Sequence, residues 1–128
     1  MKKLFLMVFA TMLLTACGQN TEKKQEALYM NITAQQAKEM MDRQQDYIIL
    51  DTRTQEEYEE SHIPGAILIP YDQIMEKAEA ALPNKDQLIL VYCRSGRRSK
   101  LAAEDLVKLG YTNIKEFGGI IDWPYEKE

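Results

Sequence analysis

Two uninterrupted apolar runs limit the folds that this 128-residue chain can adopt. Residues 47–50 (YIIL) and 88–92 (LILVY) show no alternation of apolar and polar positions, which is typical of strands buried on both faces of a parallel sheet. Helical patterns separate and follow the runs, so the chain is expected to be an α/β protein with a mainly parallel central sheet flanked by helices. In such folds ligands bind beyond the carboxyl ends of the strands, where Asp51, Arg53 and Cys93 fall.

Capping signals mark where helices begin. In a capping box, a Thr side chain and a Glu or Gln three residues later satisfy free N–H groups of the first helical turn. Thr33 with Gln36 predicts a helix over 34–44, and Thr54 with Glu57 predicts a short helix that begins after Thr54. Further patterns predict a short strand over 66–69, a helix over 71–82 capped by Asp72, a helix over 96–110 with Gly110 as its C-cap, and a more exposed strand over 111–117.

The first residues form a segment of a different kind. Lys2 and Lys3 precede an uncharged apolar run over 4–14, which is too short to span a membrane. The run ends in Leu-Thr-Ala-Cys, which resembles the lipobox of bacterial lipoproteins, where cleavage precedes a lipid-carrying cysteine. We therefore expect a signal peptide over 1–16, a lipidated Cys17 with a tether over 17–30, and a folded domain over 31–126.

This interpretation places the protein outside the cytoplasm, held by lipid to a bacterial membrane. That membrane is either the cell membrane, at its outer face, or the outer membrane, with the protein in the periplasm. An ordinary signal peptide with a coincidental cysteine remains an alternative. A buried core helix is a weaker one, because the apolar run has no polar residues at helical spacing. Loss of residues 1–16 removes two lysines and leaves 14 basic against 20 acidic residues, a net charge near −6. Such an acidic chain is not expected to bind nucleic acid.

Cys93 is then the sole thiol left for chemistry, since the chain has two cysteines and lipid would block Cys17. An unpaired cysteine in an exported protein indicates a reactive thiol or intermolecular pairing. Cations and free N–H groups at a helix start favour the thiolate and hold an anion bound to it. Cys93 is thus the predicted nucleophile, and the predicted anion-binding loop consists of Arg94, Ser95, Gly96, Arg97 and Arg98.

Six short motifs together resemble the single-domain rhodaneses, which are sulfurtransferases. They run in the family's order over most of 32–123: DTR (51–53), EEY (56–58), HIPGA (62–66), IP (69–70), VYCRSGRRS (91–99) and GGIIDW (118–123). One departure is Ser61, where the family often has a glycine before the histidine.

The resemblance implies that Cys93 takes a sulfane sulfur from a small anionic donor such as thiosulfate, holds it as a persulfide and passes it to cyanide or to a thiol, which a protein partner could carry. It also implies that Asp51 and Arg53 support the loop, and we expect Glu57 to pair with Arg53. His62 is expected to be a structural residue rather than a base, since an activated thiolate needs none.

Other functions use similar residues. Cysteine phosphatases and arsenate reductases also hold a cysteine in an anion-binding loop, but the phosphatase signature has arginine six positions after the cysteine, where this chain has Ser99. A non-enzymatic binding module or persulfide carrier is a further alternative, and sequence cannot separate a carrier from a free enzyme. No metal site or nucleotide loop is visible, so no metal and no cofactor are expected.

Overall fold

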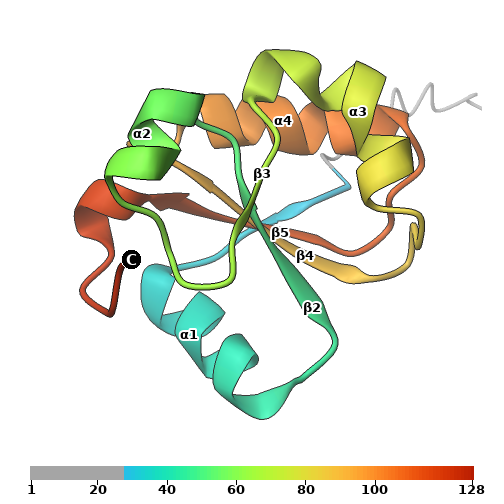
Figure 1. Ribbon diagram of the computed structural model, residues 1–128. Coiled ribbons are helices and arrows are strands. Elements are labelled where there is room, and N and C mark those ends of the chain that lie inside the picture. Colours follow the sequence, from blue (N-terminus) through green and yellow to red (C-terminus); the bar gives the residue numbers. More distant parts are fainter. Residues whose placement is uncertain (1–27) are drawn as a thin grey trace, which may run out of the picture.

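The computed structural model describes residues 28–128, which form a five-stranded sheet with helices on both faces (Figure 1). The strand order is β1-β5-β4-β2-β3, and every pairing is parallel. The predicted α/β class is confirmed. The strands are β1 (Met30–Asn31), β2 (Tyr47–Asp51), β3 (Ile67–Leu68), β4 (Leu88–Cys93) and β5 (Ile114–Gly119).

Strand β4 lies in the middle of the sheet and explains why its sequence shows no polar alternation. Ile89 and Val91 pack into a core with α3 (Ile74–Ala81) and α4 (Arg97–Lys108) on one face. Leu90 and Tyr92 pack into a second core on the face that α1 (Ala34–Arg43) covers (Figure 1). All six residues of β4 are buried, so both faces require apolar side chains.

Both capping boxes are present and fix the helix starts as predicted. Thr33 and Gln36 bond each other's backbone N–H groups at the start of α1, and Thr54 and Glu57 do the same at the start of α2 (Gln55–Glu60). The prediction of Gly110 as the C-cap of α4 is one residue off, because Leu109 is the C-cap. Gly110 comes directly after it and takes a φ of 92°, a conformation that glycine adopts without strain.

The segment expected as one helix over 71–82 is divided. A 3-10 turn, η1 (Tyr71–Gln73), comes first, and α3 begins only at Ile74. Asp72 is therefore not a cap, and no side chain caps either element. The cause is tertiary, because the N–H of Tyr71 donates to the Thr52 carbonyl at the end of β2 and holds the turn in place.

Strand β5 is also more buried than its sequence predicts. The expectation of an exposed last strand is wrong, because four of its six residues are buried. Strand β1, at the edge of the sheet, pairs with β5 on the side away from β4, with Asn31 opposite Glu116. The sequence did not predict β1, since two residues are too few to show a strand period. A second 3-10 turn, η2 (Ile120–Asp122), follows β5.

Candidate functional site

Cys93 ends strand β4, and three residues separate it from Arg97, the first residue of α4. Its side chain is 1% exposed. Gly96 turns the chain between the two elements with a φ of 110°, which an L side chain rarely adopts. This turn brings the Gly96 N–H to 3.0 Å from the Cys93 sulfur. The strand thus delivers the thiol to the N-terminal end of a helix.

Gly119, at the end of β5, forms the floor against which this loop packs. It lies opposite Cys93 in the sheet register. A Cβ atom at Gly119 would come within 1.9 Å of the Arg94 carbonyl oxygen and within 2.5 Å of the Ser95 nitrogen. The missing side chain therefore permits the loop to lie directly on the neighbouring strand.

Ser99 contacts the sulfur from the first turn of α4. Its hydroxyl lies 3.3 Å from the Cys93 sulfur and 2.7 Å from a carboxylate oxygen of Glu116. Both Ser99 and Glu116 are buried. We did not predict either residue as part of the site, although a serine directly after Arg98 was the available signal. Glu116 gave no signal, because only the sheet brings β5 beside α4.

The surroundings of Cys93 favour its ionised form. Burial raises the pKa of the thiol, but several hydrogen bonds to the sulfur act in the opposite direction and outweigh it. These bonds come from the Ser99 hydroxyl and from the backbone N–H groups of Ser99, Gly96 and Ser95. The pKa of Cys93 is therefore lower than that of an ordinary thiol, and more of it is thiolate at neutral pH.

The three loop arginines are not equivalent. Arg94 and Arg97 are exposed, and neither forms an ion pair with another residue of 28–128. Arg98 instead donates two hydrogen bonds to Glu57, at 2.7 and 2.9 Å. This pair holds the pKa of Glu57 down at about 2. The expected pairing of Glu57 with Arg53 is wrong, because α4 places Arg98 over α2.

Arg53 forms an ion pair with Asp51, the last residue of β2. Three side-chain hydrogen bonds join its guanidinium to the carboxylate, and a fourth reaches the Ser61 carbonyl. The Tyr92 hydroxyl also donates to Asp51, at 2.6 Å. Burial, followed by this contact with the carboxylate, raises the pKa of Tyr92. Asp51 and Arg53 thus form a buried network that joins β2 to β4 and does not touch the sulfur.

His62 lies away from the sulfur in the turn after α2. Its ring stacks on Tyr58 with centroids 3.9 Å apart, and its Nδ1 lies 2.8 Å from the Tyr58 carbonyl oxygen. Its backbone exchanges two hydrogen bonds with Glu128. These contacts fit the structural role expected from the sequence. Cys17 lies outside the described residues.

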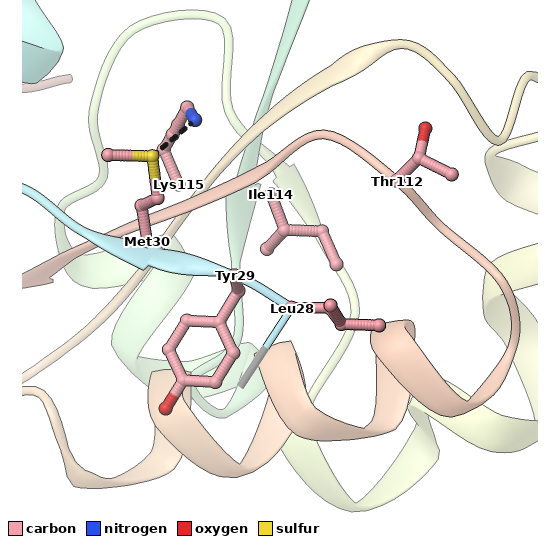
Figure 2. A pocket seen from close by; sticks show the side chains of 6 residues that line it. All are labelled: Leu28, Tyr29, Met30, Thr112, Ile114 and Lys115. Carbon is pink, nitrogen blue, oxygen red and sulfur yellow. Dashed lines mark hydrogen bonds between the residues drawn. The ribbon is translucent and has the colours of Figure 1, made fainter. Parts of the chain in front are cut away.

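Figure 2 shows an open pocket of about 240 Å³ at the opposite end of β5. It is lined by Leu28, Tyr29, Met30, Thr112, Ile114 and Lys115. Because Ile114 begins the strand and Gly119 ends it beside Cys93, this pocket is not where the thiol reacts. In residues 28–128, no cluster of His, Cys, Asp and Glu could hold a metal ion, and no helix is both long and apolar enough to cross a membrane.

Known proteins resemble this chain over most of its folded part. The family model described as "Rhodanese-like domain" matches residues 33–124. The thiosulfate sulfurtransferase PspE of Escherichia coli is 40% identical over 73 residues, which cover 57% of this chain and 70% of PspE. The thiosulfate sulfurtransferase GlpE of Coxiella burnetii is 33% identical over 97 residues, covering 75% of this chain and 88% of GlpE.

A solved structure shares the fold as well. The structure described as a rhodanese with anions from E. coli superposes with a TM-score of 0.61 at 36% sequence identity, covering 64% of this chain and 96% of that one. The architecture and the sequence therefore point to the same family.

Proposed function

Because the chain belongs to the family of rhodanese-like domains, we propose that it transfers sulfane sulfur through a persulfide on Cys93. The donor is a small anion such as thiosulfate, and the acceptor is cyanide or a thiol, free or on a protein. The observation that supports this most directly is the set of hydrogen-bond donors around the Cys93 sulfur. They stabilise negative charge on the sulfur that attacks and on the persulfide that follows.

The chemistry has two balanced steps. The Cys93 thiolate attacks the outer sulfur of thiosulfate, a new S–S bond forms, and sulfite leaves with the electron pair of the broken bond. The acceptor then attacks the outer sulfur of the persulfide, and the electron pair of that bond returns to Cys93 as thiolate. With cyanide as acceptor the product is thiocyanate. One thiol is enough for this cycle.

In this proposal the loop arginines have different tasks. Arg94 and Arg97 are exposed cations beside the thiol and attract the anionic donor. Arg98 is neutralised by Glu57 and serves mainly to hold α4 against α2. Ser95 and Gly96 supply backbone N–H groups to the sulfur. Asp51 and Arg53 support the loop through Tyr92, which directly precedes Cys93.

The first test is thiocyanate formation from thiosulfate and cyanide by the full-length chain, purified in detergent, beside Cys93→Ser. We expect turnover that the variant loses completely while its circular dichroism stays unchanged. Mass spectrometry after thiosulfate treatment should show one added sulfur on the Cys93 peptide. A folded protein with neither turnover nor added sulfur would contradict the proposal, and hydrolysis of a phosphate ester would then favour the cysteine-phosphatase alternative.

We also propose that the domain works outside the cytoplasm, on a lipid anchor at Cys17. The support is the order of Lys2 and Lys3, the apolar run over 4–14 and the Leu-Thr-Ala-Cys sequence. In a bacterial host, the protein should take up labelled fatty acid and sediment with membranes, and Cys17→Ser should abolish the label. Labelling that persists in Cys17→Ser, or its absence from the unaltered chain, would refute the anchor without bearing on sulfur transfer.

A further inference from the structure

The hydroxyl of Ser99 has more acceptors within reach than it has protons. Its oxygen lies 2.7 Å from Glu116 Oε1, 3.0 Å from the Gly96 carbonyl oxygen, 3.3 Å from the Cys93 sulfur and 3.4 Å from the Gly118 carbonyl oxygen. A serine hydroxyl donates one hydrogen bond at a time. When it donates to an ionised Glu116, it does not donate to the sulfur.

Glu116 is an unusual residue to find behind a nucleophile. It is 2% exposed, and none of the ion pairs within residues 28–128 includes it. Its Oε1 also accepts a hydrogen bond of 2.8 Å from the Gly118 N–H. Two acidic groups, a carboxyl and a thiol, thus lie on either side of one hydroxyl. A second negative charge in such a buried pair is costly, so the protonation of one group depends on that of the other.

We propose that Glu116 is a positioning residue for sulfur transfer, which takes up a proton as Cys93 ionises and so releases the Ser99 hydroxyl to the sulfur. The thiol proton passes to the Ser99 oxygen while the Ser99 proton passes to Glu116 Oε1, so no other reactant is needed. The neutral carboxyl then donates to Ser99, and Ser99 donates to the thiolate. This inference rests on the proposed function of Cys93 as the nucleophile.

Other charged or titratable groups lie near this pair, but they do not take part in the proton exchange. Arg98 acts on Cys93 from α4 but is held by Glu57. Tyr29, from the segment before β1, is the further titratable group that responds to Glu116. Burial, and after it the charges of Glu104 and Glu116, raise the pKa of Tyr29, so it stays neutral at physiological pH.

The test measures both members of the pair in the full-length chain. The rate at which iodoacetamide alkylates Cys93 reports its thiolate, and mass spectrometry of the Cys93 peptide keeps Cys17 out of the signal. In Glu116→Gln the side chain cannot ionise, so the Cys93 titration should move to lower pH and alkylation well below the midpoint should become about tenfold faster. Glu104→Gln removes an exposed charge from α4 and should leave the titration unchanged.

The reciprocal measurement follows the Glu116 carboxyl by carbon NMR with labelled glutamate, assigned by its loss in Glu116→Gln. Because each group acts on the other, neutralising Cys93 by alkylation should change the Glu116 carboxyl signal. Coincident Cys93 titrations in Glu116→Gln and the unaltered chain, or a carboxyl signal insensitive to alkylation, would overturn the proposal. Neither readout requires sulfur transfer, so failure of this inference and failure of the proposed function remain distinguishable.

Discussion

Ser99 shows how a single hydroxyl sets the reactivity of the site. It is the side-chain donor to the Cys93 sulfur and the strongest cause that lowers the pKa of this thiol. Ser99→Ala should therefore raise the pKa of Cys93 and slow its alkylation about tenfold at any pH below the midpoint. The pH dependence of alkylation measures this shift.

Ser95 offers a matched control for that prediction. Its backbone N–H also donates to the sulfur, but its side chain is exposed. Ser95→Ala keeps the backbone donor, so its titration should coincide with that of the unaltered chain. An equal shift in both variants would mean that the loop, rather than the Ser99 hydroxyl, controls the thiol.

Two helices are joined by the ion pair of Glu57 and Arg98, which are 25% and 18% exposed. The pair holds the Glu57 pKa at about 2, below its ordinary value of 4.5. A lowered acid pKa stabilises the fold fully above 4.5, and this contribution is lost as pH falls through about 2. Glu57→Gln should thus lower the free energy of unfolding by about 2 kcal/mol at pH 7, as measured by urea unfolding. The loss should vanish as the pH approaches the pKa of Glu57 in the folded protein, about 2.

Glu56→Gln is the control at the level of the helix. Glu56 lies in the same first turn of α2 but is exposed. It carries the same favourable interaction with the helix dipole and lacks the arginine. Glu56→Gln should lower the free energy of unfolding at pH 7 far less than Glu57→Gln does. Equal costs would show that the charge acts on α2 alone and that the link to α4 adds nothing.

At the scale of the whole molecule, the end of β5 packs directly against the Cys93 loop. Gly119 has a φ of −127°, which any residue adopts, so alanine would be unfavourable there only because its Cβ meets the Arg94 carbonyl. We expect Gly119→Ala to cost about 2 kcal/mol, as overpacking does, and to slow Cys93 alkylation by displacing the loop. Thermal unfolding and alkylation rate measure the two effects.

Gly65→Ala separates lost stability from loop displacement. Gly65 has a φ of 81° and open space around it, so alanine introduces backbone strain without touching the site. This variant should lower the unfolding temperature and leave Cys93 alkylation unchanged. Slower alkylation in both variants would mean that general destabilisation, and not the β5 contact, governs the thiol.

Local signals were enough to predict much of the fold. Runs such as 88–92 have the same apolar character whatever surrounds them, and the capping boxes at Thr33 and Thr54 act over four residues. The α/β class and the starts of α1 and α2 followed from these. The division of the segment over 71–82 did not, because a hydrogen bond to Thr52, far back in the chain, decides it.

The sequence by itself determined that Cys93 stands between a buried strand and a helix, in a loop of arginines. Only the tertiary structure decided which groups reach that thiol. Arg98 turns to Glu57, Ser99 turns to the sulfur, and Glu116 comes from a strand 17 residues further on. The physical reason is that strand order and register bring distant residues together, whereas helical and strand periods report only on neighbours along the chain.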